Sequence, residues 1–441
     1  MKRRTKIYKF NNGATLIYKK RKAFEITALN AGFFAGYAYC KGKHGLPHLF
    51  EHMLMKQTDK RTQEQVIEDK VKITPLNAYT SPYFLVTSFS ESNRRVEKCF
   101  EFASDCLLSS NFDKDRFEKE KKVVLEERKD RETQAMFDFD YQSSNFIRHN
   151  EILQPQYVFG SEEELETYTI EDLMQFRKEN FVSDKFIMSV CTSLPFCKIK
   201  KLAKKYFINK LVVPEKKSEF EPIIDKNIKI GQSLKVYQTP EKNYQVKIYF
   251  SLKTEIDEFR ISQLIYMALK PFNNMNDMFY YKSRKLGLVY SAIALSSVDN
   301  LSTDNAVVFE FSTSKFENIS LIVDLLNESI IKLKNGIVTQ EYLDQCKDNA
   351  IIRFDNERYN SYRSNVIDNL EIYQNRGKIE VIPKKTKIKE INAITLDRVN
   401  DMINRIFDKN NDIYIFMEGN FEGITVPTIE EYKQQIYKNV K

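Results

Sequence analysis

The order of helix and strand patterns recurs at a constant distance along this chain of 441 residues. Residues 169–173 open a helix pattern, and a strand pattern follows from Phe186. Residues 395–399 and Asp412 repeat these two landmarks 226 residues later. A repeat of about half the chain predicts two homologous domains, with chance recurrence of two helix–strand units as the alternative.

Each half combines strand and helix signals. In the first half, alternating apolar and polar residues flank Asn11-Asn12-Gly13, which is typical of a β-hairpin. The apolar run over 24–39 predicts a further strand, and helical spacing appears over 93–109 and from 113 to about 146. The second half begins with strand patterns over 234–252 and continues with helix patterns over 258–269 and about 275–285 and with further strands. The mixture predicts the α+β fold class.

Prolines and charged residues interrupt every regular period between the two halves. We therefore expect an N-terminal domain at 1–215, a linker at 216–230 and a C-terminal domain at 231–441.

Residues 48–52 read His-Leu-Phe-Glu-His. On a helix, His48 and His52 share one face and Glu51 lies at its edge; Pro47 suits the first turn. Two neutral imidazoles, a carboxylate base and an open coordination position are what a hydrolytic zinc site requires. Only one of the four histidines lies outside 44–52. The alternative is a set of ordinary histidines on a surface or core helix.

A third metal ligand must come from elsewhere, and the long helix expected after residue 113 carries candidate carboxylates. Glu120 and Glu127 are seven apart and share a face, whereas Glu126 points elsewhere. Glutamates on helices are usually solvated, so the spacing alone leaves the ligand open.

These motifs resemble the pitrilysin family of zinc metallopeptidases, the inverzincins, to which processing-peptidase subunits belong. Residues 45–53 match its Gly-x-x-His-x-x-Glu-His-Met helix, and 120–127 match its Glu-x-x-x-Val-x-x-Glu segment. Gln154-Pro155 and Gly160 look like further landmarks of that family. The resemblance implies that each domain is a mostly antiparallel β-sheet packed with helices on one side, and that only the first domain holds metal.

The resemblance also assigns roles in the first domain. It implies that His48, His52 and Glu127 bind one Zn²⁺ per chain, that Glu51 is the catalytic general base, and that Glu120 orients a ligating histidine.

Substrate contacts are implied in both domains. One segment looks like the family's edge strand, along which peptides pair by β-augmentation; it comprises Asn77, Ala78, Tyr79 and Thr80. In the second domain, Tyr290 matches a family tyrosine that holds the substrate backbone. The family arginine is expected at Ser283; Arg284 is adjacent, and whether it substitutes is open.

Composition restricts the partners and the compartment. The net charge of +8 comes from 69 basic and 61 acidic residues, and the densest basic run, Lys19–Lys22, suits a solvated strand end better than a nucleic-acid or membrane patch. No apolar stretch is long enough to cross a bilayer, and no export signal follows the basic start. Six cysteines without a C-x-x-C pair suit reduced thiols, so we expect a cytoplasmic protein.

The family resemblance implies a zinc metalloendopeptidase that hydrolyses short or unfolded peptides, for degradation or precursor processing. Two half-domains imply a dimeric chamber, formed either by a homodimer or by a heterodimer with a related subunit. The alternative is a catalytically silent or partner-dependent subunit that acts as a peptide-binding scaffold. A purely structural zinc site fits less well, because such sites are usually closed by four Cys or His ligands.

Overall fold

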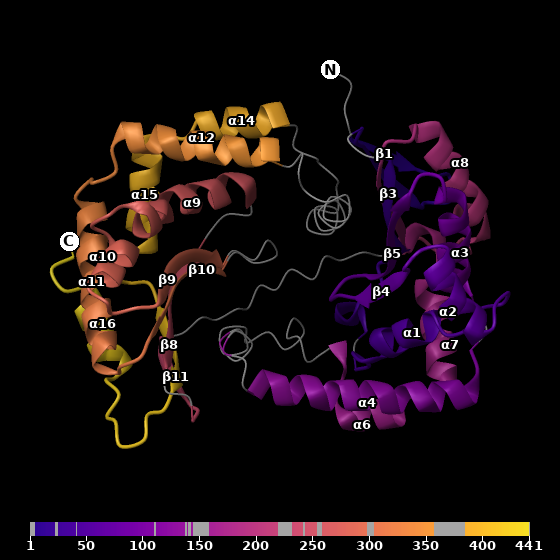
Figure 1. Cartoon of the computed structure of the whole chain (residues 1–441), viewed down its shortest axis with the longest axis horizontal. Helices are drawn as coiled ribbons and strands as arrows, with labels where there is room; N and C mark the ends of the chain where they lie inside the picture. Colours follow the sequence, from indigo (N-terminus) through magenta and orange to yellow (C-terminus); the bar gives the residue numbers. More distant parts are fainter. Residues whose placement is uncertain are drawn as a thin grey trace. The chain divides into compact units, whose positions relative to one another are not determined.

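The computed structural model describes residues 5–22, 25–40, 42–109, 112–136, 139, 143, 158–218, 232–240, 243–253, 258–297, 304–356 and 384–440. They form two compact units (Figure 1). The first unit holds the described residues up to Thr133 together with 158–218, and the second unit holds the others. Most of the expected linker, 216–230, lies outside the described residues.

The first unit is built on a six-stranded sheet with the order β1-β2-β6-β3-β5-β4. Only the β2–β6 pair among these strands is parallel, so the sheet is mostly antiparallel. The strands are β1 (Thr5–Lys9), β2 (Thr15–Lys20), β3 (Ile26–Phe33), β4 (Asn77–Thr80), β5 (Leu85–Ser92) and β6 (Phe186–Thr192).

Helices cover one face of this sheet and enclose the first core with it (Figure 1). The core is rich in fully buried aromatic rings such as Phe33, Phe50, Phe100 and Phe186, each of which contributes about 1.5–3 kcal/mol by leaving water. The helices are α1 (Leu46–Leu54), α2 (Gln63–Lys72), α3 (Val96–Leu108), α4 (Lys114–Met136), α6 (Glu162–Thr167), α7 (Ile170–Asn180) and α8 (Phe196–Tyr206).

The second unit is built on a five-stranded sheet with the order β7-β11-β8-β10-β9. Here the β7–β11 pair is parallel and the other described pairs are antiparallel. The strands are β7 (Ser233–Gln238), β8 (Tyr244–Lys253), β9 (Ser291–Ser297), β10 (Asp304–Thr313) and β11 (Ile413–Gly419).

Helices again pack on one face of the sheet around a second hydrophobic core (Figure 1). They are α9 (Glu258–Asn274), α10 (Phe279–Lys285), α11 (Glu317–Lys334), α12 (Gln340–Asn356), α14 (Lys384–Asn392), α15 (Leu396–Ile406) and α16 (Ile429–Ile436).

The two sheets repeat one topology, because β2-β6-β3-β5-β4 and β7-β11-β8-β10-β9 place corresponding strands in the same order with the same parallel pair. The repeated landmarks are also found: Thr169 caps α7 before β6, and Thr395 caps α15 before β11. The predicted α+β fold of two homologous halves is confirmed.

Some element boundaries differ from the sequence prediction. The apolar run that continues past β3 leaves the sheet after Phe33 and forms a 3₁₀ turn at Tyr37–Tyr39. Helix α9 extends through Pro271 to Asn274, beyond the expected end at Leu269, and α10 begins at Phe279 rather than at Met275. Apolar periodicity identified these elements but did not resolve their ends.

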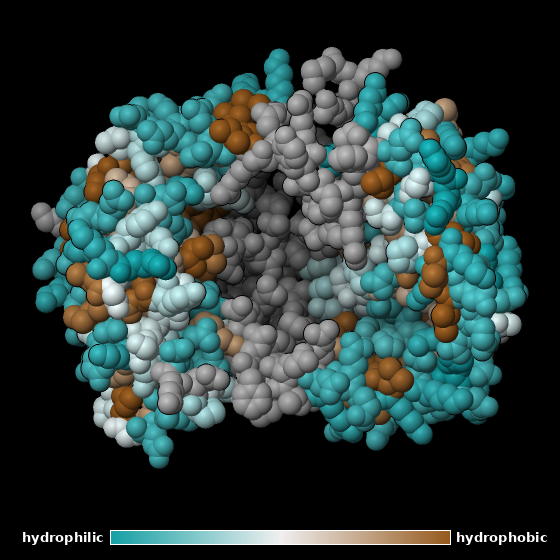
Figure 2. All heavy atoms as spheres, viewed as in Figure 1, coloured by the Kyte–Doolittle hydropathy of each residue, from teal (hydrophilic) through white to brown (hydrophobic). Residues whose placement is uncertain are grey.

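Hydrophilic residues predominate on the face in Figure 2, and hydrophobic residues form small separate patches there. Scattered patches of this size are ordinary for a folded chain. Among the described residues, no helix combines the length and apolar character needed to cross a membrane.

Candidate metal centre

Helix α1 carries three polar side chains that lie beside its apolar face. Leu49 and Phe50 are fully buried and anchor its apolar face. His48, Glu51 and His52 lie beside that face, as the three- and four-residue spacing requires. The two imidazole rings are 4.7 Å apart between centroids, so the helix alone brings two nitrogen donors together.

The start of α1 is packed tightly against the segment before α6. A Cβ atom at Gly45 would lie 2.1 Å from the carbonyl oxygen of Phe159, so only glycine allows this approach. The Phe159 ring meets His48 edge-on at 4.9 Å and limits its rotation. Gly160 has φ +71°, which favours glycine, whereas Gln154-Pro155 lies outside the described residues. The sequence analysis did not identify Phe159 as a neighbour of this site.

Helix α4 brings two carboxylates to His52. Val124 is fully buried and orients the helix, so that Glu120 and Glu127 face α1. Glu127 Oε2 lies 3.3 Å from His52 Nε2, and Glu120 Oε2 lies 3.4 Å from His52 Nδ1. One imidazole is thus held between two carboxylates, one at each ring nitrogen.

One ligand atom from each of His48, His52 and Glu127 lies within 4.8 Å of the other two. A tetrahedral zinc ion with bonds of about 2.0–2.2 Å separates its ligand atoms by about 3.3–3.6 Å. The distance between His52 and Glu127 falls in that range. Two imidazoles and one carboxylate also leave a fourth position open, so the donor set fits a catalytic zinc ion.

His48 has the electrostatic character of a metal ligand. Its Nδ1 is buried and has no hydrogen-bond partner among the described residues. Burial, together with the nearby His52, lowers the pKa of His48 to about 3. The imidazole is therefore neutral at ordinary pH, the form that binds a metal.

Glu120 links the metal centre to a lysine. Lys56, which follows the end of α1, places Nζ 2.9 Å from Glu120 Oε1. Burial raises the pKa of Glu120, but hydrogen bonds from His52 and Lys56 outweigh it, and the pKa lies below its ordinary value. The carboxylate is therefore ionised and can hold the Nδ1 proton of His52. Lys56 is absent from the sequence prediction, although its four-residue spacing from His52 was visible.

Glu51 lies next to the cluster and is oriented by the sheet. The Thr80 hydroxyl donates a hydrogen bond to Glu51 Oε2 at 2.6 Å. Burial raises the pKa of Glu51, while the Thr80 hydrogen bond and His52 act in the opposite direction. A carboxylate with a raised pKa is a better proton acceptor, which is the property required of a general base.

Strand β4 contains the four residues predicted to contact substrate in this unit, Asn77, Ala78, Tyr79 and Thr80, and it is the last described strand of its sheet. Asn77 is exposed and Ala78 is buried. The Tyr79 hydroxyl accepts a hydrogen bond from Asn30 Nδ2 at 3.0 Å. An edge strand whose last residue bonds Glu51 puts a backbone suited to strand addition beside the metal cluster.

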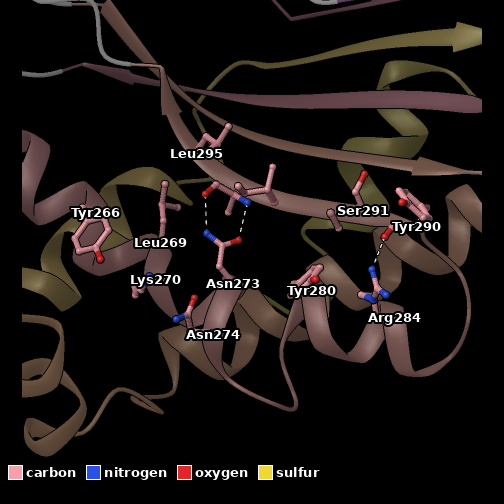
Figure 3. A pocket seen from close by; sticks show the side chains of 13 residues that line it. Tyr266, Leu269, Lys270, Asn273, Asn274, Tyr280, Arg284, Tyr290, Ser291 and Leu295 are labelled. Atoms are coloured by element: carbon pink, nitrogen blue, oxygen red, sulfur yellow. Dashed lines mark hydrogen bonds between the residues drawn. The ribbon is translucent and has the colours of Figure 1, made fainter. Parts of the chain in front are cut away.

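Ser283 and Arg284 lie in different environments on α10 of the second unit. Ser283 is fully buried, and its hydroxyl donates to the Phe279 carbonyl at 2.6 Å. Arg284 is exposed, and its Nη1 donates to the Tyr290 carbonyl at 2.7 Å. The Tyr290 side chain is 84 % exposed, and both residues line one cavity (Figure 3). Arg284 is thus the residue here that presents a guanidinium next to Tyr290.

The sequence matches one peptidase family over consecutive parts. Residues 38–156 match the family described as Insulinase (Peptidase family M16), and residues 167–350 match the Peptidase M16 inactive domain. Mitochondrial-processing peptidase subunit beta of Neurospora crassa is 29 % identical over 37 % of this chain, and the match covers only 34 % of that subunit. An uncharacterized zinc protease of Rickettsia felis is 23 % identical over 92 % of this chain and 96 % of its own length.

Solved structures agree with this assignment at the level of fold. The periplasmic protease PqqL from Escherichia coli superposes with a TM-score of 0.81 at 15 % identity, over 99 % of this chain and 50 % of PqqL. A protease from Helicobacter pylori superposes with a TM-score of 0.71 at 18 % identity, over 94 % of this chain and 99 % of that protein. With two consecutive domain matches and a shared two-unit fold, the chain belongs to peptidase family M16.

Proposed function

We propose that this chain is a zinc-dependent endopeptidase that hydrolyses short or unfolded peptides. The observation that carries the proposal is the convergence of His48, His52 and Glu127, with Glu51 beside them. Relatives named zinc proteases support the choice of metal. A silent scaffold would typically lack one of these four groups, and the chain retains all of them.

In this proposal the protein residues divide the work. Zinc, when bound, acts as a Lewis acid towards the substrate carbonyl and the attacking water. Glu51 takes a proton from that water and then donates it to the leaving amine nitrogen, so that the carboxylate is regenerated. Glu120, held by Lys56, keeps the His52 ring oriented with Nε2 towards Glu127.

Strand β4 binds the peptide in this mechanism. An extended substrate adds as a further strand, and its backbone hydrogen bonds fix the distance between the scissile bond and Glu51. Thr80 contributes twice, because it ends the edge strand and donates to Glu51. Arg284 and Tyr290 supply further contacts to the substrate backbone.

We also propose that the active form is a dimer enclosing a chamber, either of two identical chains or with a related subunit. Relatives named subunit beta of mitochondrial-processing peptidase support the second arrangement. Light scattering of the purified chain distinguishes a monomer from a homodimer. A monomer that gains activity when a related subunit is added would indicate the heterodimer.

The test is cleavage of a mixed peptide pool by the purified chain, with and without a chelator, alongside Glu51→Gln. Losing a general base typically costs about 10²- to 10⁴-fold in rate and leaves the metal ligands intact. We expect chelator-sensitive cleavage, and a folded, zinc-loaded variant with almost none. Glu126→Gln, on an exposed residue of α4, is the control and should retain activity. Full activity of Glu51→Gln would exclude the assigned base.

A further inference from the structure

A cavity of about 690 Å³ lies in the second unit between β9, the last described strand of the sheet, and the helices α9 and α10 (Figure 3). Ala292 and Ala294 are buried towards the helices, and their small side chains leave the space open. The strand residues that line it run from Tyr290 to Leu295. At about 3.3 Å per residue, the groove is long enough for an extended segment of about five residues.

The edge of β9 is held in place by Asn273 of α9. Asn273 Nδ2 donates to the Ala294 carbonyl at 2.8 Å, and the Ala294 N–H donates to Asn273 Oδ1, also at 2.8 Å (Figure 3). The side-chain amide occupies the place that a neighbouring strand would take. In an antiparallel ladder every second residue faces the same way, so Ala292 directs its N–H and C=O into the groove as well.

The lining is positively charged. Lys270 and Arg284 line the groove, and no aspartate or glutamate does. Neither cation forms an ion pair with the residues that the structure describes. Lys270 lies 5.4 Å from the centre of the Tyr266 ring, and Arg284 uses one donor on the Tyr290 carbonyl, which leaves four N–H donors. Figure 3 places the two cations towards opposite ends of the groove, with Asn273 between them.

We propose that this groove binds the carboxylates of an acidic peptide segment, and so selects acidic substrates. The inference rests on the proposed peptidase function, since it deepens the substrate class of that enzyme. Carboxylates pair with Lys270 and Arg284, while the backbone N–H and C=O of Ala292 favour an extended chain over a compact anion.

Direct binding to zinc-loaded Glu51→Gln protein tests the groove without cleavage. The probes are two amidated peptides with a charge-neutral fluorophore, one containing glutamates and one with glutamines in their place. A glutamine peptide with a free terminal carboxylate separates side-chain from C-terminal recognition. We expect tighter binding of the glutamate peptide, measured by anisotropy, and weaker preference at high salt.

Lys270→Met should weaken binding of the glutamate peptide by about two- to fivefold, the range for a partly exposed ion pair, and leave the glutamine peptide unchanged. Adding Arg284→Gln should abolish the preference. Lys285→Met removes the same charge from an exposed residue of α10 outside the groove and serves as the matched control. Equal binding of the two peptides, or equal effects of Lys270→Met and Lys285→Met, would overturn the proposal.

The outcomes separate this inference from the proposed function. Selective, Lys270-dependent binding without cleavage by the unmodified protein, either alone or with a related subunit added, would support the groove and refute the peptidase. Chelator-sensitive cleavage without tighter binding of the glutamate peptide would support the peptidase and refute the acidic groove. A single-stranded oligonucleotide that displaces the peptide with higher affinity, or loss of self-association in Lys270→Met, would instead assign the groove to nucleic acid or to a second copy of the chain.

Discussion

Replacing Glu120 by glutamine should weaken zinc binding, although Glu120 is not proposed as a ligand. The residue is 4 % exposed, and its two oxygens face two donors, His52 Nδ1 at 3.4 Å and Lys56 Nζ at 2.9 Å. A glutamine side chain has one oxygen and one NH₂ group, so one of the two contacts becomes donor against donor in either orientation. His52 then loses its orientation, or Lys56 loses its partner.

Loss of a partner that orients a ligating histidine costs about 10- to 100-fold in metal affinity, which corresponds to about 1.4–2.8 kcal/mol. Zinc affinity is measured by competition with a chromogenic chelator, with circular dichroism to establish that the variant is folded. Glu126→Gln is the matched control, because it makes the same change on the same helix at a side chain that is 75 % exposed. An unchanged zinc affinity in folded Glu120→Gln would refute the proposed link from α4 through His52 to the metal.

Three further perturbations test the architecture around the site. Gly45→Ala forces a Cβ to within 2.1 Å of the Phe159 carbonyl oxygen, so α1 must shift. We expect the free energy of unfolding, measured in urea, to fall by about 1–3 kcal/mol and zinc binding to weaken. Unchanged values would disprove the close approach. Arg61→Met breaks ion pairs with Glu101 and Asp105 and should cost about 3 kcal/mol at pH 7. Burial raises the pKa of Glu101, but the Arg61 hydrogen bond outweighs this effect, and the pKa lies below its ordinary value. The ion pair therefore stabilises the fold fully above pH ~4.3, and this stabilisation is lost as the pH falls through the pKa of Glu101 in the folded state. The difference in unfolding free energy between wild type and Arg61→Met should shrink over that pH range, and a constant difference would contradict the pairing. Zinc at about 100 times its Kd should raise the free energy of unfolding by about 2.7 kcal/mol, and a thermal melt unaffected by chelator would argue against a metal bound to the native state.

The chemistry of the first site was visible in the sequence because it depends on local spacing. His48, Glu51 and His52 share a face of α1 through helical geometry alone. Glu120 and Glu127 were candidates for the same reason. In the structure, Glu120 lies at Nδ1 of His52 and Glu127 lies at Nε2. This arrangement depends on how α4 packs against α1, and no local sequence pattern encodes it.

In the second unit, too, a sequence motif identified residues whose environment only the packing decided. A tyrosine at 290 and a nearby basic residue could be identified by alignment to a motif, but the choice between positions 283 and 284 depends on which side of α10 faces the core. Ser283 is buried and Arg284 is exposed, because one helical position turns a side chain by about 100°. Asn273, which holds the edge of β9, is separated from Ala294 by 21 residues and has no sequence signal.

By itself, the sequence determined the helices and strands, the repetition of their order in two halves, and the zinc-type donor set on α1, since each follows from periodicities of 2 and 3.6 residues or from caps. The tertiary structure decided which donors meet, that Lys56 supports Glu120, that Thr80 orients Glu51, and that two cations share a groove at β9. These contacts join residues far apart in the chain. Their distances depend on core packing, which is a property of all the packed elements together and of no single segment.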